Sequence, residues 1–349
     1  MVLGSGVGSL AFDYAVLAAA LWFIGGLLVD GWAHNHLDLR AEGFFTPYHA
    51  LFYAGFVAVA AVVLAGTWRN RRNAASLRAA IPSGYGSTLA GLAIFAVGGA
   101  LDLMWHIAFG VEQDLEALFS PTHLLLAVGI GAILCGPIRA VARRAPARAW
   151  REQLPALAAL ALFATLVLFF FMWAYSLAAG RAGDPHLANP ALPARSLALM
   201  IEYQMGHGIT AIVVRSIVLA GIALWAARRF DVPFGAIPLL VTVPSVLVGA
   251  MLDPSPHFLF LQLCASLVAG LACDIALSRY GVLGRGAWGG RAVGFGAPFL
   301  FWATYLALAN VQSGGFWWTA HVVYGAPVIG GLVGLLLAIL MEPRTEPAS

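Results

Sequence analysis

The sequence predicts an all-α, polytopic integral membrane protein, and two observations support that prediction. The first is composition, because 61% of the 349 residues are hydrophobic, only 10% are charged and the mean hydropathy is +0.86. A soluble domain of this length cannot bury so much apolar surface. The second is that the apolar residues form segments long enough to cross a bilayer as helices, with short polar stretches between them.

We expect about ten transmembrane helices in a single membrane domain over residues 1–349. They fall at 11–33, 47–68, 86–108, 121–138, 154–177, 205–226, 233–252, 256–277, 293–311 and 317–341. They pair into five hairpin-like repeats: the first over 11–68, the second over 86–138 and three more over 154–341. The segment before the first span has neither a basic region nor a cleavage site, so we expect that span to be retained as a helix.

All the basic residues are arginines, and they cluster after alternate spans. The clusters follow the second, fourth, sixth and eighth spans, at Arg69–Arg78, Arg139–Arg151, Arg228–Arg229 and Arg279–Arg291. Because such clusters stay in the cytoplasm, both termini are predicted to be cytoplasmic, in a bacterial inner membrane. The net charge of +3 reflects this topology and does not indicate binding to nucleic acid.

The nine histidines fall on the opposite side of this topology. Each lies at or near the outer end of a predicted span or in an outer loop, and none lies on the arginine-rich side. The extracytoplasmic face is therefore predicted to be the functional face.

The first two hairpins carry the same polar motif. An Asp and a His stand four residues apart near the end of the outgoing span, and the return span opens with Thr/Ser-Pro-x-His. The four-residue spacing places the Asp and the first His on one helix face. A hydroxyl N-cap followed by proline fixes the start of the return helix. The two sets are Asp30, His34 and His49, and Asp102, His106 and His123.

Each set offers one carboxylate and two imidazoles, which suit Cu(II), Zn(II) or non-haem Fe(II). The sequence therefore predicts two metal sites. The alternative is that these side chains are polar residues at the water interface, with each Asp satisfying a helix end. His36 could replace His34 as a ligand or support it from nearby.

The second half of the chain carries weaker echoes of the motif. These are Glu202 with His207, Asp253 with His257, and His321 in the last hairpin. They could complete a further metal site or act as helix caps. Arg215 falls well inside the sixth span and needs a polar partner there. The outer aromatic residues, among them Phe44 and Tyr53, are expected to form an interfacial belt, with the wall of an apolar substrate pocket as the alternative.

The repeated motif resembles that of the C subunit of the copper membrane monooxygenases, the particulate methane and ammonia monooxygenase family. In that family Asp-x-x-x-His followed by Thr-Pro-Ser-His supplies an Asp/His/His copper site inside the membrane near its outer face. Asp102, His106 and His123 match the ligand positions, and Trp105 matches the Trp before the first His. Asp30, His34 and His49 match them as well, and Phe45-Thr46-Pro47 fits the second half of the motif.

The resemblance implies copper as the cofactor and an oxidative role, with oxygen activated against a small apolar or membrane-soluble substrate. The composition makes the lipid bilayer one partner, and the resemblance implies other membrane subunits or a periplasmic electron donor as further partners. The residues themselves leave three other functions open. These are a copper-handling permease, a haem-binding electron-transfer protein and a structural accessory subunit.

Overall fold

The computed structural model describes residues 9–37, 44–110, 114–145, 149–174, 194–281, 288–313 and 318–342. Within these ranges all regular structure is helical, and nine helices are long and apolar enough to cross a bilayer. The prediction of an all-α, multi-pass membrane protein is confirmed. The seventh expected span, 233–252, corresponds to α9 (Ala236–Leu252), which is apolar but only 17 residues long. The chain forms two compact units, Met1–Leu166 and Val167–Ser349.

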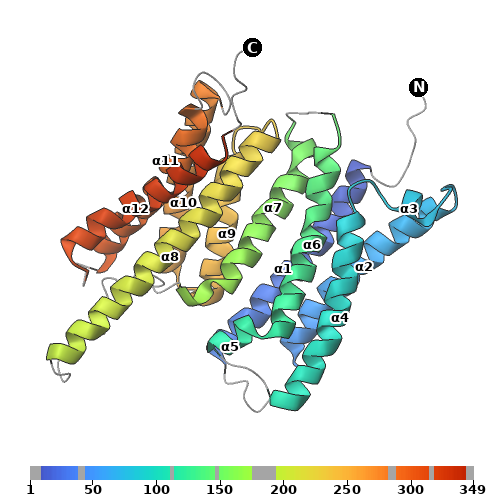
Figure 1. The fold of residues 1–349 in the computed structure, drawn as a ribbon, viewed down its shortest axis with the longest axis horizontal. Coiled ribbons are helices and arrows are strands. Elements are labelled where there is room, and N and C mark those ends of the chain that lie inside the picture. The colour runs from blue at the N-terminus through green and yellow to red at the C-terminus, as the bar shows by residue number, and fades with distance from the viewer. Residues whose placement is uncertain are drawn as a thin grey trace. The chain divides into compact units, whose positions relative to one another are not determined.

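Unit 1 contains the two hairpins that carry the repeated motif (Figure 1). Its helices are α1 (Leu10–His36), α2 (Pro47–Arg71), α3 (Leu77–Ala80), α4 (Gly86–Phe109), α5 (Asp114–Phe119), α6 (Pro121–Ala142) and most of α7 (Trp150–Phe170). The helix α1 packs against α2, and α4 packs against α6. The motif therefore lies at one end of this unit, and the arginines that end α2 and follow α6 lie at the other.

Glycines let the two helices of each hairpin approach closely. A Cβ atom on Gly55 of α2 would lie 2.5 Å from Cα of Phe23 in α1, and one on Gly129 of α6 would lie 2.9 Å from the backbone nitrogen of Phe95 in α4. Helix backbone cannot move aside as a flexible side chain can, so these positions require glycine. The rings of Phe23 and Phe95 meet edge to face at 5.0 Å between centroids and join the hairpins in the core.

The internal repeat extends further than the polar motif. A Phe-x2-Gly-x3-Asp-x3-His pattern begins at Phe23 in α1 and again at Phe95 in α4. A His-x2-Phe/Leu-x2-Gly pattern begins at His49 in α2 and again at His123 in α6. In addition, α1 contacts α6 and α2 contacts α4, which is the pairing that an approximate two-fold relation between the hairpins requires.

An ion pair between a buried carboxylate and a partly exposed arginine closes the arginine-bearing end of unit 1. Asp13, in the first turn of α1, is fully buried and pairs with Arg144, which follows α6. The hydroxyl of Tyr85 donates a hydrogen bond of 2.7 Å to the same carboxylate. A buried carboxylate needs such partners, because removing one would leave an uncompensated charge. These contacts tie the start of α1 to both helices of the second hairpin.

Unit 2 contains η1 (Met172–Ala174), α8 (Ala194–Arg229), α9, α10 (Pro256–Tyr280), α11 (Trp288–Ser313) and α12 (Ala320–Leu340). The helices α9 and α10 pack together, as do α11 and α12, in agreement with the last two predicted hairpins. The long helix α8 packs against α11 and α12. The loop of the predicted third hairpin lies outside the described residues, so its pairing stays a prediction.

Two arginines of unit 2 have different kinds of partner, an uncharged one for Arg215 and a carboxylate for Arg291. Arg215, in the middle of α8, is buried, donates a 2.6 Å hydrogen bond to Gln262 of α10, and places its guanidinium 4.4 Å from the ring centroid of Phe301. Arg291 of α11 instead binds Glu342 through two hydrogen bonds of 2.7 and 3.0 Å just beyond α12. That contact lowers the pKa of the Glu342 carboxyl.

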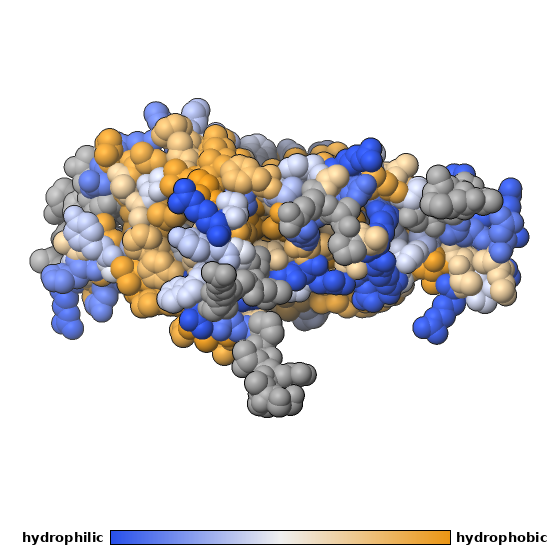
Figure 2. Space-filling model, turned by 90° about the horizontal axis from the view of Figure 1, so that it is seen from above, coloured by the Kyte–Doolittle hydropathy of each residue, from blue (hydrophilic) through white to orange (hydrophobic). Residues whose placement is uncertain are grey.

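Large apolar side chains are exposed along the helices of both units. Examples are Val57 and Leu64 on α2, Ile107 on α4, and Leu332 and Leu336 on α12. Figure 2 shows hydrophobic residues over much of the visible face, with hydrophilic residues gathered in clusters. Contiguous exposed apolar surface of this kind is expected where helices face lipid.

Candidate metal centre

The start of each return helix positions one histidine. The Oγ1 atom of Thr46 accepts a hydrogen bond of 3.0 Å from the backbone N–H of His49, and Oγ of Ser120 accepts one of 3.3 Å from that of His123. A proline follows each cap at the first helical position, as the sequence predicts. The local sequence therefore fixes each histidine in the first turn of its helix.

The first hairpin brings its three predicted ligands together. The Nε2 atoms of His34 and His49 lie 4.0 and 3.5 Å from Oδ2 of Asp30. The two imidazole rings are 5.7 Å apart between centroids. Asp30 and His49 are buried, and His34 is partly exposed. We call this group triad 1.

The second hairpin builds the same group from Asp102, His106 and His123, which we call triad 2. Nε2 of His106 lies 3.5 Å from Oδ2 of Asp102, and Nε2 of His123 lies 3.4 Å from Oδ1. The imidazole rings are 5.8 Å apart. Asp102 and His106 are buried. Groups of three or more His, Cys, Asp or Glu side chains whose ligand atoms all lie within 4.8 Å of one another could hold a metal ion. In the part of the chain that the structure describes, triads 1 and 2 are the two such groups.

The Asp–His separations within the triads are longer than those of direct ion pairs. Charge-assisted hydrogen bonds between imidazole and carboxylate close to about 2.7–2.9 Å, whereas the separations here are 3.4–4.0 Å. Ligand atoms that surround an ion with bonds of about 2.0–2.2 Å in tetrahedral geometry lie roughly 3.3–3.6 Å apart. The separations of 3.4 and 3.5 Å fall in that range, with different oxygens of Asp102 facing the two histidines of triad 2, and the 4.0 Å separation at His34 is wider. The three ligand atoms of each triad lie within 4.8 Å of one another, so each group could hold an ion.

Triad 2 is supported by neighbouring hydrogen bonds. The Nδ1 atom of His106 lies 3.3 Å from the carbonyl oxygen of Gly110, and Nδ1 of His123 lies 2.9 Å from Oγ of Ser120. Such partners for Nδ1 leave Nε2 to bind a metal. The hydroxyl of Thr122 donates a 2.7 Å hydrogen bond to Oδ1 of Asp102. This donor set is the usual environment of a metal-binding histidine and carboxylate.

Triad 1 has fewer such contacts. Oδ1 of Asp30 is buried, and no described residue donates a hydrogen bond to it. A buried carboxylate oxygen without a donor is costly unless a cation binds it. The ring of Phe44 stacks on His49 at 5.2 Å with an angle of 15° between the planes. In triad 1 the apolar ring of Phe44 therefore contacts the His49 imidazole, whereas in triad 2 hydrogen bonds contact the two imidazoles.

The two triads are neighbours within unit 1. The rings of His49 and His106, one from each triad, are 6.5 Å apart, and Phe44 lies 5.7 Å from His106 as well. The charge of Asp30 acts on His106 and His123 of triad 2. The sequence could not decide whether the two sites are separate or adjacent. The fold places them side by side.

The other predicted ligands take different positions. His36 is exposed, stacks on Trp32 and hydrogen-bonds through Nδ1 to the Trp32 carbonyl at 2.8 Å, so it lies outside triad 1. His207 packs 4.2 Å from the ring of Tyr203. The remaining predicted residues, all in unit 2, are Glu202, Asp253, His257 and His321. Asp253 caps the turn before α10 by accepting a hydrogen bond of 2.9 Å from the backbone N–H of Ser255. The other three are exposed.

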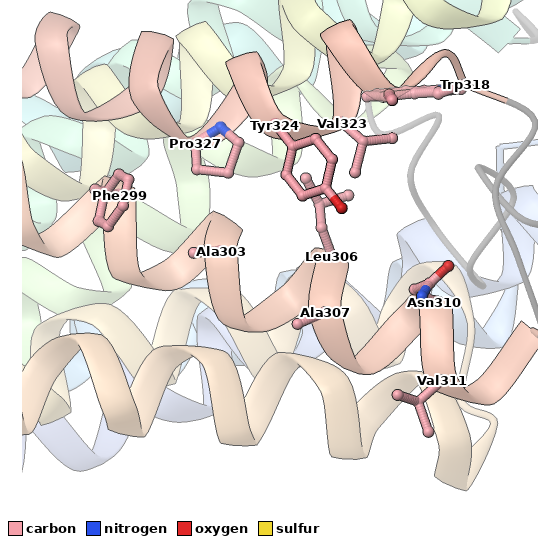
Figure 3. Close-up of a pocket in the computed structure, with 11 residues that line it drawn as sticks. Phe299, Ala303, Leu306, Ala307, Asn310, Val311, Trp318, Val323, Tyr324 and Pro327 are labelled. Carbon is pink, nitrogen blue, oxygen red and sulfur yellow. The ribbon is translucent and has the colours of Figure 1, made fainter.

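Unit 2 also holds a pocket of about 670 Å³ between α11 and α12 (Figure 3). Phe299, Ala303 and Leu306 of α11 and Pro327 of α12 line its apolar part, and Asn310 and Tyr324 add polar groups. Its lining carries no carboxylate, histidine or cysteine, so it does not offer a set of metal ligands.

Comparison with known proteins adds no relative. No family model matches the chain, and no curated protein or solved structure matches it. The site is therefore defined by its own geometry: a membrane helical unit with two neighbouring Asp/His/His groups that could bind metal.

Proposed function

We propose that the two triads bind two copper ions in one centre, and that the protein is a copper-dependent, oxygenase-like membrane protein or a subunit of one. The observation that carries the proposal is the geometry of the triads. In each, one carboxylate and two imidazole nitrogens converge at the spacing of metal ligands, in a largely buried position. Copper is chosen over zinc and iron because both triads match the copper-site motif of the monooxygenase C subunit, residue by residue.

The chemistry divides between the ion and the chain. Bound copper would activate oxygen toward a small apolar or membrane-soluble substrate. The chain's residues hold the ligands and keep water away. Thr46 and Ser120 fix the return-helix histidines, Thr122 holds Asp102, and Phe44 covers the space between His49 and His106. Such shielding from water would protect reactive species from side reactions.

The same proposal assigns a location and partners. The positive-inside rule places the triads at the extracytoplasmic end of unit 1, in a bacterial inner membrane with cytoplasmic termini. Insertion of one atom of O2 into a substrate reduces the other atom to water with electrons and protons from outside, so we propose a periplasmic electron donor or a further membrane subunit as partner. Cysteine accessibility at the loop between α2 and α4, compared with the loop that carries Phe44, tests the orientation.

The decisive experiment is metal analysis of protein purified from native membranes, with optical and EPR spectra. We expect about two coppers per chain with Cu(II) signals of nitrogen and oxygen ligation. The paired variants His34→Ala/His49→Ala and His106→Ala/His123→Ala should each remove one copper, while the matched control His36→Ala should remove none.

Other results would redirect or end the proposal. Zinc or iron at the same stoichiometry would keep the site and change its chemistry, and a Soret band would assign haem. Copper that exchanges freely would favour a metal-handling permease. Wild-type protein without metal, or paired variants that keep two ions, would overturn the proposed centre.

A further inference from the structure

The two hairpins differ at one large side chain that is packed inside the bundle beside the centre. The repeat aligns Tyr53 of α2 with Ala127 of α6, and it aligns Gly99 of α4 with Leu27 of α1. A Cβ atom on Gly99 would lie 3.0 Å from Cε1 of Tyr53 and 3.1 Å from its hydroxyl oxygen. Gly99 therefore makes room for the Tyr53 ring. The corresponding pair in the other half of the repeat, Leu27 and Ala127, contains no hydroxyl group.

The Tyr53 hydroxyl lies inside the bundle, and the Tyr53 ring lies next to His49 of triad 1. Its ring is 6.5 Å from that of His49, 5.8 Å from that of Phe44 and 5.7 Å from that of Phe95. The charges of Asp30 and Asp102, one from each triad, both act on the phenol. Tyr53 was expected in an outer aromatic belt. The structure instead buries its hydroxyl against α4, because Gly99 leaves space there.

A buried phenol is costly unless its O–H finds an acceptor. The Tyr53 hydroxyl is fully enclosed, and no described residue forms a hydrogen bond with it. Phenylalanine would fill the same space among Phe44, Phe52 and Phe95 without that cost, so packing alone does not explain a tyrosine here. The charged groups that act on the phenol are Asp102 and Asp30, one from each triad. An acceptor held in that centre would satisfy the hydroxyl.

We propose that Tyr53 is a positioning residue, whose hydroxyl donates a hydrogen bond to the small anionic or oxygen ligand that completes the coordination of copper in this centre. The inference rests on the proposed copper centre. It makes the centre asymmetric, since the second hairpin offers Ala127 at the related position. Only α2, through the Tyr53 hydroxyl, therefore donates a hydrogen bond to the small ligand.

The test uses azide as a probe on the full-length protein loaded with Cu(II). Azide binding is followed through its charge-transfer band, while copper is counted separately. We expect Tyr53→Phe to keep the copper stoichiometry and to weaken azide binding roughly tenfold, as the loss of one hydrogen bond to a charged acceptor predicts. The matched control is Tyr48→Phe, five residues earlier on the same helix, which should bind azide as the wild type does.

A second variant keeps the test independent of the Tyr53 substitution. Gly99→Ala retains the hydroxyl but forces the ring to move, so it should weaken azide binding as well, while Gly25→Ala, which meets nothing within 4 Å, should not. If Tyr53→Phe keeps its copper and its azide affinity is unchanged, the proposed role of Tyr53 is overturned and the copper centre is not. Loss of copper from Tyr53→Phe would also overturn that role, because Tyr53 would then be a ligand. Wild-type protein that binds no copper would overturn the centre itself.

Discussion

The two motif hairpins present the same three ligands but support them differently. In the second hairpin Asp102 accepts a hydrogen bond from Thr122, and His123 has Ser120 on its second ring nitrogen. In the first hairpin Oδ1 of Asp30 has no hydrogen-bond donor among the described residues, and the orientation of His49 relies on stacking against Phe44. Triad 2 is therefore preorganised, and triad 1 has more freedom to adjust when an ion binds.

One sequence position explains much of this difference. The residue before the return-helix histidine is Thr122 in the second hairpin and Tyr48 in the first. A threonine hydroxyl on a short side chain can reach the neighbouring Asp, and the structure shows that bond at 2.7 Å. The structure gives Tyr48 no corresponding bond to Asp30. We therefore expect triad 2 to bind metal more tightly than triad 1.

The largest expected effect comes from the close helix contacts beneath each triad. Gly55→Ala in the first hairpin and Gly129→Ala in the second should each cost about 3 kcal/mol of unfolding free energy, because the new Cβ meets helix backbone. Each should also disturb the triad of its own hairpin more than the other. Thermal unfolding in detergent and metal counts measure both effects. Gly25→Ala is the control, and equal behaviour of all three variants would contradict the role of these contacts.

A smaller effect is expected from the hydroxyl that supports Asp102. Thr122→Val keeps the shape of the side chain and removes the donor, so the metal affinity of triad 2 should fall about tenfold to a hundredfold, as is typical for such supporting contacts. Competition with a chelator measures the affinity of each site. Triad 1 should be unaffected, and a loss from triad 1 instead would show that the ranking of the two sites is wrong.

The smallest expected effect is an increase in the metal affinity of triad 1. Tyr48→Thr gives the first hairpin the residue found in the second, so it should strengthen metal binding at triad 1 by up to about tenfold if the new hydroxyl reaches Asp30. The same chelator competition reports the change. An unaltered affinity would mean that the difference between the triads arises from Phe44 or from the exposure of His34, rather than from the missing hydroxyl.

The sequence alone determined the helices and the three residues of each triad. Apolar segments of spanning length, hydroxyl-proline caps at Thr46 and Ser120, and the four-residue spacing of Asp and His are local features, because they depend on helix geometry and bilayer thickness. The structure accordingly starts α4 at Gly86 and α6 at Pro121, where the sequence predicts them. It also brings each predicted Asp/His/His set together.

The tertiary structure decided which groups meet across hairpins. The neighbourhood of His49 and His106, the partner of Arg215 at Gln262, and the burial of Tyr53 against Gly99 all join residues on helices distant in sequence. The choice of His34 over His36 also depended on the fold, since His36 turns back to the Trp32 carbonyl. Such contacts follow from how closely packed helices fit together, and glycines and aromatic rings set that fit only once all four helices are in place.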